Sequence, residues 1–170
     1  IFSSLFPKHP YGTQTVLGTQ ENLKNPSITN IKNYYKQWYV PNNMAICMSG
    51  DLDPDATIAL IDKYFGGLKP NPELPKLDLP KEAPITQPVV KEVLGPDAES
   101  VALAWRFPGV SDKDFEILQV VSQVLYNGKA GLIDLDLNQQ QKVLNSYGYP
   151  MGLADYSALL LGGLPKQGQT

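Results

Sequence analysis

The sequence predicts an α+β fold, with helices and strands in an irregular order. Apolar residues recur at helical spacing in some segments and alternate with polar ones in others. The predicted order is helix–strand–helix, followed by strand–strand–helix–helix–strand. Between these two groups lies a stretch with six prolines in nineteen residues, Pro70 to Pro88. A doubly wound parallel sheet would need strict alternation of strands and helices, so this order argues against one.

The first group of elements lies between residues 27 and 65. Ser27 is predicted to cap a helix that runs to Val40, because apolar side chains follow it at the spacing of one helical face. Alternation over 44–49 predicts a strand buried on both faces. Asp53, with proline directly after it, predicts the start of a second helix that runs to Phe65 and stops at the following glycines.

The proline-rich stretch is predicted to be an extended linker. Proline fixes φ and removes a backbone donor, so residues 70–86 suit neither a helix nor the interior of a sheet. We therefore expect one domain over 1–69 and another over 87–170. The chain opens on Ile1 without an initiator methionine, and we expect both of its ends to be cuts through a longer protein.

The second group is predicted to contain three strands and two helices. Apolar alternation marks the strands, and a resemblance to a capping box at Ser111 and Asp114 marks the first helix, which Asn127-Gly128 ends. Turn residues separate the first two strands. In chain order the predicted elements are 87–94, 100–107, a helix from Ser111 to Asn127, a helix over 132–144 and a strand over 156–161.

Composition excludes two classes of protein. The chain of 170 residues has 14 Lys and Arg against 17 Asp and Glu, and Arg106 is its one arginine. Nucleic-acid surfaces need basic stripes with arginine forks, so a nucleic-acid partner is not expected. No segment approaches the roughly 18–20 apolar residues of a membrane-spanning helix, so no membrane span is expected either. The single cysteine excludes an internal disulfide but leaves the compartment open.

Taken one by one, the chemically versatile residues predict no active site. His9 is the only histidine and lies in a proline-bounded turn, so we expect a structural or solvated loop histidine. Cys47 has no second cysteine or histidine nearby and is expected to be a buried, inert thiol. Asp51, Asp53 and Asp55 have the spacing of a calcium loop, but the position that needs glycine holds alanine, so a helix cap is favoured.

Several motifs nevertheless occur together in a familiar order. They are His9-Pro10-Tyr11-Gly12, Val16-Leu17-Gly18-Thr19, Tyr39-Val40-Pro41-Asn42-Asn43-Met44, Ser49-Gly50-Asp51, Asp62-Lys63-Tyr64-Phe65-Gly66-Gly67-Leu68, Phe107-Pro108-Gly109 and Val124-Leu125-Tyr126-Asn127-Gly128. In this order and spacing they resemble the pitrilysin/insulinase family of zinc peptidases, the class with an inverted H-x-x-E-H motif. The resemblance covers essentially the whole chain.

The resemblance implies parts of two tandem homologous α/β-roll domains of the LuxS/metallopeptidase-like type. Residues 1–69 would be the C-terminal part of the first domain, 70–86 the linker and 87–170 the truncated N-terminal part of the second. The family's zinc-binding histidines, its general-base glutamate and its third zinc ligand all fall upstream of the position that matches Ile1. No catalytic residue and no metal ligand can therefore be carried over, and zinc is implied only for the parent protein.

One candidate substrate-binding residue is implied by the family pattern. Many members carry a glycine-rich turn and then an arginine and a tyrosine in an Arg-x-x-x-Gly-Leu-Ala-Tyr-like segment. Here Tyr147 would be the tyrosine, but Asn138 or Gln139 occupies the region of the arginine. If that pair holds peptide substrate in the family, this chain lacks half of it.

The implied function is that of a non-catalytic portion of a zinc metalloendopeptidase that degrades peptides. The piece would form chamber wall and interdomain scaffold, would have the remaining domains of its parent as partners, and would be inactive alone. The alternative is a piece of a non-catalytic partner subunit or peptide-binding scaffold of the same fold. An unrelated α+β interaction module is a third possibility. Incomplete domains expose sheet edges, so self-association is also expected.

Overall fold

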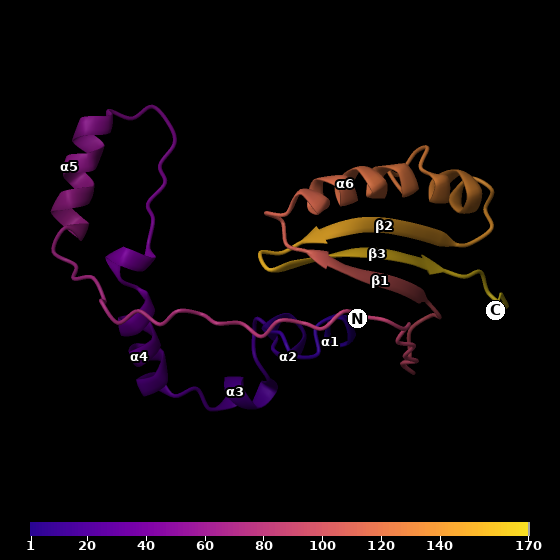
Figure 1. The fold of residues 1–170 in the computed structure, drawn as a ribbon, viewed down its shortest axis with the longest axis horizontal. Coiled ribbons are helices and arrows are strands. Elements are labelled where there is room, and N and C mark those ends of the chain that lie inside the picture. The colour runs from indigo at the N-terminus through magenta and orange to yellow at the C-terminus, as the bar shows by residue number, and fades with distance from the viewer. Residues whose placement is uncertain (170) are drawn as a thin grey trace. The chain divides into compact units, whose positions relative to one another are not determined.

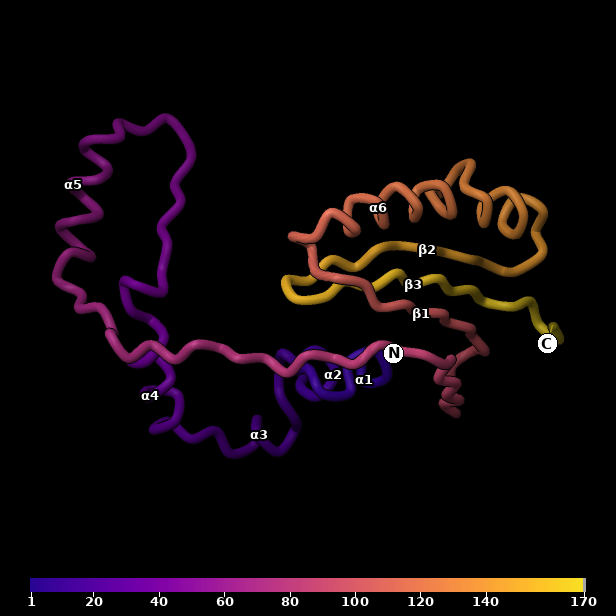
Figure 2. The backbone as a smooth tube through the Cα atoms, in the orientation of Figure 1, coloured from indigo at the N-terminus to yellow at the C-terminus, as the bar shows by residue number. Residues whose placement is uncertain are grey.

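The computed structural model describes residues 1–169, and they form two compact units. Unit 1 combines Ile1–Thr13 with Lys81–Thr170, whose last residue lies outside the described part, and unit 2 is Gln14–Pro80. Figure 2 traces this path: the N-terminal residues and the segment that leads into the sheet belong to the same unit. No described helix is long and apolar enough to cross a membrane.

Unit 1 is built on a three-stranded antiparallel sheet. Its strands are β1 (Val101–Pro108), β2 (Asn145–Gly152) and β3 (Tyr156–Leu164), in the spatial order β1–β3–β2. The register sets Trp105 opposite Leu159 and Leu159 opposite Pro150. The mixed helices and antiparallel sheet confirm the predicted α+β class.

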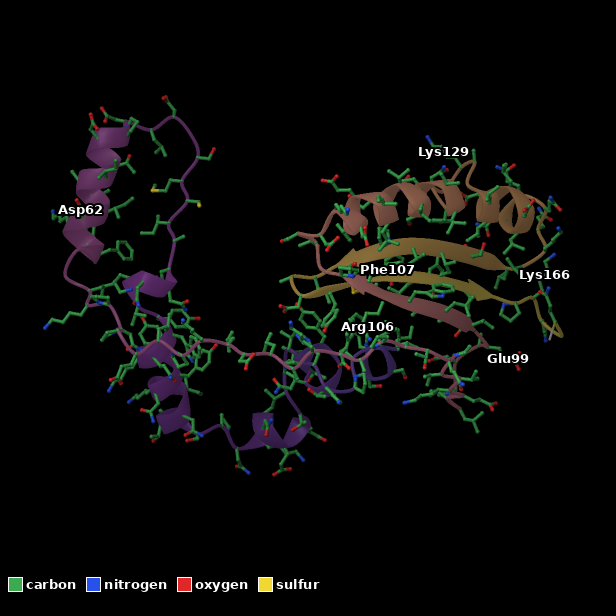
Figure 3. All side chains as sticks on the ribbon, in the orientation of Figure 1. Asp62, Glu99, Arg106, Phe107, Lys129 and Lys166 are labelled. Carbon is green, nitrogen blue, oxygen red and sulfur yellow. The ribbon has the colours of Figure 1, made fainter. Side chains whose placement is uncertain are left out.

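Helices cover both faces of this sheet. The long helix α6 (Lys113–Leu125) lies over one face, and two single-turn helices, α1 (Phe2–Leu5) and α2 (Pro10–Thr13), lie on the other (Figure 1). Side chains along a strand alternate between the two faces of a sheet. The consecutive residues Arg106 and Phe107 of β1, both labelled in Figure 3, therefore lie on opposite faces. The predicted helix after residue 111 is therefore confirmed, with Asp112 rather than Ser111 as its cap.

The core of unit 1 lies between α1 and β3. Leu5 and Phe6 are buried against Ala158 and Leu160, and partly buried side chains such as Tyr156 surround them. Fully burying one such large side chain contributes about 1.5–3 kcal/mol, so this contact is what fixes the N-terminal segment to the sheet.

The prediction for residues 132–144 is wrong in its second half. A short π-helix, η2 (Asp134–Asn138), forms there, and the chain then turns through Gln141, whose φ of 52° is left-handed, to enter β2. In β2, Tyr147 and Tyr149 alternate with Gly148 and Pro150. Glycine and proline have low strand propensity, so the sequence pattern did not predict a strand here. The strand predicted over 156–161 is confirmed as β3.

Unit 2 contains the predicted helices of the first group. They are α4 (Ile28–Trp38) and α5 (Pro54–Phe65), preceded by the short α3 (Gln20–Lys24), with the single turn η1 (Pro41–Asn43) after α4. The predicted caps are confirmed: Ser27 Oγ accepts from Asn30 N at 3.2 Å, and Asp53 Oδ1 accepts from Ala56 N at 3.0 Å. The Asp53 bond explains the aspartate spacing as a helix start.

The asparagines of the Pro-Asn-Asn-Met motif stabilise unit 2. Asn42 Nδ2 donates to Asn71 O at 2.7 Å, and Asn71 N donates back to Asn42 Oδ1 at 2.9 Å. Asn43 Nδ2 donates to Trp38 O at 2.9 Å, at the end of α4. These bonds attach the start of the proline-rich segment to α4, which a side chain without an amide could not do.

Two predicted strands do not form among the described residues. Residues 44–49 and 87–94 are extended or irregular, have no ladder partner, and expose their apolar side chains. A strand needs a hydrogen-bonded neighbour as well as a suitable pattern, and the pattern alone predicted these two. As a consequence Cys47 is exposed, so its predicted burial is wrong.

The compact units and the predicted domains describe different divisions of the chain. Unit 1 takes in Ile1–Thr13, which the domain prediction assigns to 1–69, and resumes at Lys81, inside the predicted linker. A boundary between homologous domains is not defined by compactness alone, so the division at 70–86 stays a prediction.

Gly109 offers a test of this packing, since its ideal Cβ would collide with the backbone oxygen of Ala154 in the β2–β3 turn. We expect Gly109→Ala to lower the free energy of unfolding by about 1–3 kcal/mol, because backbone must shift to relieve the contact. Urea denaturation followed by circular dichroism measures the change. Gly95→Ala is the matched control, because a Cβ there meets open space. Equal midpoints for the two variants would contradict the expectation.

Candidate functional site

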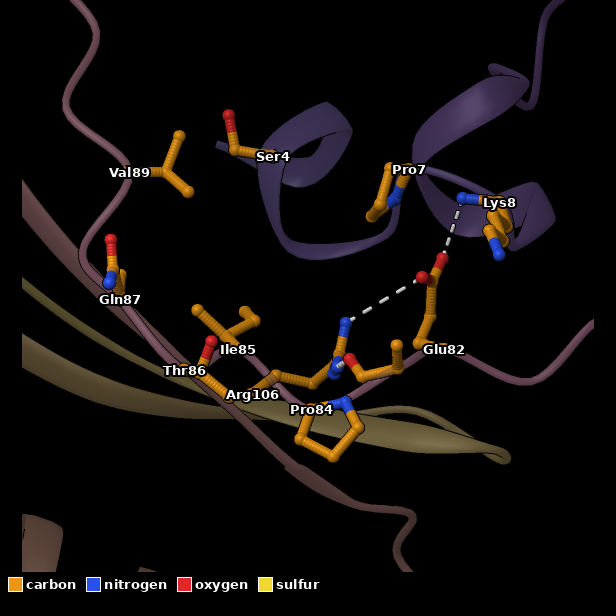
Figure 4. Close-up of a pocket in the computed structure, with 11 residues that line it drawn as sticks. Ser4, Pro7, Lys8, Glu82, Pro84, Ile85, Thr86, Gln87, Val89 and Arg106 are labelled. Atoms are coloured by element: carbon orange, nitrogen blue, oxygen red, sulfur yellow. Dashed lines mark hydrogen bonds and ion pairs between the residues drawn. The ribbon is translucent and has the colours of Figure 1, made fainter.

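One polar cluster of unit 1 lies on the sheet face that carries α1 and α2. It comprises His9 from the turn before α2, Glu82 from the segment leading into the sheet, Arg106 from β1 and Tyr156 from β3. A cavity of about 350 Å³ opens beside it, lined by Ser4, Pro7, Lys8, Glu82 to Gln87, Val89 and Arg106 (Figure 4).

Glu82 joins three parts of unit 1. Its Oε1 accepts from Lys8 N and from His9 N, both at 2.7 Å, and its own N donates to the Tyr156 hydroxyl at 2.8 Å. Burial would raise the pKa of this carboxyl, but the two backbone N–H donors and the positive Arg106 outweigh burial and hold it below its ordinary value. Glu82 is therefore ionised wherever the protein is folded near neutral pH.

Arg106 provides the positive charge of the cluster. Its guanidinium donates to the backbone oxygens of Leu5 and Ala83 and lies 3.8 Å from Glu82 Oε2 (Figure 4). It also lies over the Tyr156 ring, 5.6 Å from the centroid. Only a planar fork with several donors can serve two carbonyls and a carboxylate together, so lysine could not replace it. The sole arginine of the chain is thus committed to internal contacts.

His9 is buried, with 1% of its surface exposed. Its Nδ1 accepts from Tyr11 N at 3.3 Å, and the rings of Tyr11 and Tyr156 pack against it at centroid distances of 4.2 and 5.3 Å. Nε2 lies 3.6 Å from Asp155 Oδ2 and has no hydrogen-bond partner among the described residues. The sequence predicted either a structural or a solvated histidine in this turn. The burial of His9 confirms the structural role, and the solvated one is wrong.

This cluster is suited to joining segments of chain rather than to catalysis. Glu82 and Arg106 bond mainly to backbone groups, and neither a serine nor a cysteine lies within hydrogen-bond reach of His9 in the part of the chain that the structure describes. Within residues 1–169, no group of three or more His, Cys, Asp and Glu side chains could hold a metal ion. The donor set therefore does not fit a zinc site.

A second polar cluster organises the turn between α6 and η2. The buried Asp134 carboxylate accepts from the backbone of Asn127, Gly128 and Gly131 at 3.0, 2.9 and 3.2 Å. Burial would raise its pKa, but these bonds and one from the Asn138 amide hold it below the ordinary value. Another cavity of about 350 Å³ lies here, lined by Tyr126, Gly128, Lys129, Asp134, Asn138, Gln139, Leu144 and Asn145.

Tyr147, the predicted substrate-binding residue, lies on β2 opposite Gly162, and its ring covers that glycine. Asn138, in the region of the missing arginine, instead bonds Ser146: its Oδ1 accepts from Ser146 N at 2.8 Å and its Nδ2 donates to Ser146 O at 3.0 Å. Side chains of consecutive residues in a strand point to opposite faces, so those of Ser146 and Tyr147 lie on different sides of the sheet. The structure does not bring the two positions together.

Sequence reasoning did not single out Glu82 or Arg106. Glu82 lies in a proline-rich stretch that predicts only a linker, and Arg106 occupies a polar position in an alternating strand, where a solvated side chain is usual. The one available signal was that Arg106 is the only arginine of the chain and lies between Trp105 and Phe107.

Comparisons with known proteins agree on one family. Residues 27–163 match the family model described as the peptidase M16 inactive domain. The zinc protease PqqE of Helicobacter pylori is 28% identical over 171 aligned positions, which cover 96% of this chain and 38% of that protein. A probable mitochondrial-processing peptidase subunit beta of Schizosaccharomyces pombe is 30% identical over 81 residues, 48% of this chain and 18% of that protein.

Solved structures give the same result. A protease from Helicobacter pylori superposes with a TM-score of 0.72 at 27% identity, over 93% of this chain and 40% of that one. The periplasmic protease PqqL of Escherichia coli shares the fold, with a TM-score of 0.66 at 16% identity, over 96% of this chain and 19% of that one. This chain thus spans about two fifths of the length of the Helicobacter pylori proteins that it matches.

The lowered pKa of Glu82 predicts how the stability of unit 1 depends on pH. A carboxyl whose pKa is lower in the folded than in the unfolded state stabilises the fold above the unfolded value, here about 4.5, and loses that effect as pH falls through the folded value. We expect the urea midpoint of unfolding to fall as pH drops below about 4.5. The midpoint of Glu82→Gln should fall less, because in that variant only other carboxyls with lowered pKa values, such as Asp134, still make stability depend on pH. Parallel pH profiles for the two proteins would contradict this.

Proposed function

The chain belongs to the M16 peptidase family, as its resemblance to pitrilysin and insulinase predicts, and we propose that it is a non-catalytic, scaffolding portion of a zinc metallopeptidase that degrades peptides. The family model that it matches describes an inactive domain. Its relatives include a protein named as a zinc protease, of which it spans 38%. The activity and the peptide substrate are proposed for the whole protein.

The observation that carries the scaffolding role is the way Glu82 and Arg106 are used. Both bond to backbone of the N-terminal segment, at Lys8, His9 and Leu5, and both belong to the part of unit 1 that contains the sheet. If the domain division at 70–86 is right, these bonds attach residues 5–9, in the C-terminal part of a first peptidase-like domain, to Glu82 in the linker and to Arg106 in the start of a second domain. Such a connection would build the wall of a peptide chamber and fix the angle between its halves.

Zinc is proposed to belong to the rest of the protein. This chain has one histidine and one cysteine, its described residues contain no metal cluster, and His9 is enclosed by aromatic rings. A catalytic zinc site needs three protein ligands with an open fourth position. No step of the hydrolysis is therefore assigned to a residue of this chain.

The remaining domains of the parent protein are the partners that we propose for unit 2. Among the described residues, its extended segment 44–49 has no ladder partner, and both of its long helices expose apolar side chains. Exposed apolar groups of this kind usually mark an interaction surface. Those concerned are Ile28, Ile31, Tyr34, Tyr35, Met44, Ile46, Met48, Ile58, Leu60 and Tyr64.

Tyr147 is proposed to contact the peptide substrate. Its ring is half-buried over Gly162 and lies beside the exposed ring of Tyr149, with 6.2 Å between the centroids, on the sheet face away from α6. Two adjacent aromatic rings, one of them exposed, on this face suit apolar side chains of an extended peptide. The arginine that precedes this tyrosine in many family members is replaced here by Asn138 or Gln139. This replacement favours the second candidate function, a piece of a non-catalytic partner subunit.

An activity measurement tests the proposed function. We expect this chain alone to show no chelator-sensitive peptidase activity above a mock-purified control, and the full parent protein, expressed from its extended coding region, to show such activity. In that protein, Tyr147→Ala should raise KM for a peptide, while Val120→Ala, an exposed change on α6, should leave it unchanged. Chelator-sensitive activity in this chain alone would contradict a non-catalytic role. An inactive parent with a degenerate H-x-x-E-H would favour the partner subunit.

Self-association through β1 is a further expectation for the isolated chain. Among the described residues β1 has a ladder partner on one side only, and Val101, Leu103 and Trp105 are exposed on it. Charged residues on an edge strand oppose edge-to-edge pairing, so Leu103→Lys should reduce the concentration-dependent rise in mass seen by light scattering. Val120→Lys adds the same charge away from the edge and serves as the control. A wild-type chain that stays monomeric at all concentrations would rule the association out.

A further inference from the structure

The turn that follows α6 contains a dipeptide with a chemistry of its own. Asn127-Gly128 is the only Asn-Gly sequence of the chain, and both residues are exposed to solvent. Lys129, labelled in Figure 3, comes directly after it. An asparagine followed by glycine deamidates readily, because glycine has no side chain to hinder its backbone nitrogen. The turn therefore carries both reactants of a spontaneous reaction.

Deamidation begins when the Gly128 nitrogen attacks Cγ of Asn127. The N–Cγ bond forms, the Gly128 N–H proton is lost to a base in the solvent, and the Asn127 amide nitrogen takes up a proton and leaves as ammonia. Water then opens the cyclic imide at one of its two carbonyls, which leaves aspartate or isoaspartate at position 127. The only co-reactant is water, which reaches both residues because they are exposed.

The folded turn holds the attacking nitrogen in a hydrogen bond. Gly128 N donates to Asp134 Oδ2 at 2.9 Å. The same oxygen accepts from Asn127 N at 3.0 Å and from Gly131 N at 3.2 Å. Burial would raise the pKa of the Asp134 carboxyl, but these bonds and one from Asn138 keep it below the ordinary value. Asp134 is therefore ionised and a weak base near neutral pH, so it holds the Gly128 proton rather than removing it.

The side chain that would be attacked is held as well. Asn127 Oδ1 accepts from Lys129 N at 3.0 Å and from Ala130 N at 2.9 Å. Its Nδ2 donates to Gln123 O, in the last turn of α6, at 3.1 Å. Ring closure removes Nδ2 from the side chain and moves Oδ1, so these bonds are lost on the way to the imide, at a cost in free energy.

We propose that Asn127 is a latent deamidation site, which the folded turn keeps unreactive because Asp134 holds the attacking Gly128 nitrogen. The product would carry a carboxylate on the residue whose backbone N–H binds Asp134, and it would lack the amide that donates to Gln123 O. Like charges at one turn repel each other, so the product does not fit the turn between α6 and η2. The inference goes beyond the proposed function, because it needs neither zinc nor peptide.

Peptide mapping by mass spectrometry measures the reaction in the full chain, incubated folded at mildly alkaline pH. We expect Asn127 to deamidate roughly tenfold or more faster in Asp134→Asn than in the unsubstituted chain, the factor that corresponds to one lost hydrogen bond to a charged acceptor. Asp136→Asn, the same change at an exposed position of the same short helix, should leave the rate unaltered. A folded Asp134→Asn that deamidates no faster than the unsubstituted chain would overturn the inference.

A second measurement needs no variant. Slow amide exchange at Leu159 and Leu160 in β3 shows whether Asp134→Asn is folded. If that protection is lost, the unsubstituted chain decides the question, because Asn127 should deamidate much more slowly in the native chain than in the same chain unfolded in urea. Equal rates in the two states would overturn the inference. The peptidase measurement bears on neither rate, so the two proposals succeed or fail separately.

Discussion

The ion pair of Arg106 and Glu82 determines how unit 1 is assembled. One partner lies on β1 and the other on the segment that leads to it, and between them they satisfy a carbonyl at the end of α1 and two N–H groups before α2. Positive charge near a helix C-terminus and negative charge near a helix N-terminus are both favourable. Helices of a single turn do not persist by themselves, and this pair holds them in place together with the burial of Leu5 and Phe6 against β3.

The residues that build the site explain what the sequence could and could not predict. Caps and turns are local, so Ser27, Asp53 and the glycines after Phe65 marked helix ends correctly. Strand pairing is not local, and residues 44–49 carry a strand pattern without a partner among the described residues. The cluster around His9 depends on contacts between residues far apart in the sequence, which no periodicity encodes, and only the resemblance pointed to the His-Pro-Tyr-Gly turn.

A non-catalytic member of a peptidase fold can keep its polar residues for structural reasons. In this chain the buried carboxylates of Glu82 and Asp134 both accept several backbone N–H bonds, an arrangement that elsewhere could prepare a carboxylate for chemistry. Here each one fixes a turn instead. The backbone bonds that fix these turns are also among the causes that hold the two pKa values below their ordinary values.

The long sequence separations of the contacts between the N-terminal segment and the sheet have a consequence for biosynthesis. Arg106 and Leu5 are 101 positions apart, and Tyr11 and Asp155, whose side chains bond at 3.1 Å, are 144 apart. At ordinary translation rates the ribosome needs on the order of ten seconds to add the residues between the last pair. Throughout that time Leu5 and Phe6 lack the β3 surface that buries them, so two large apolar side chains stay without this cover until β3 is made.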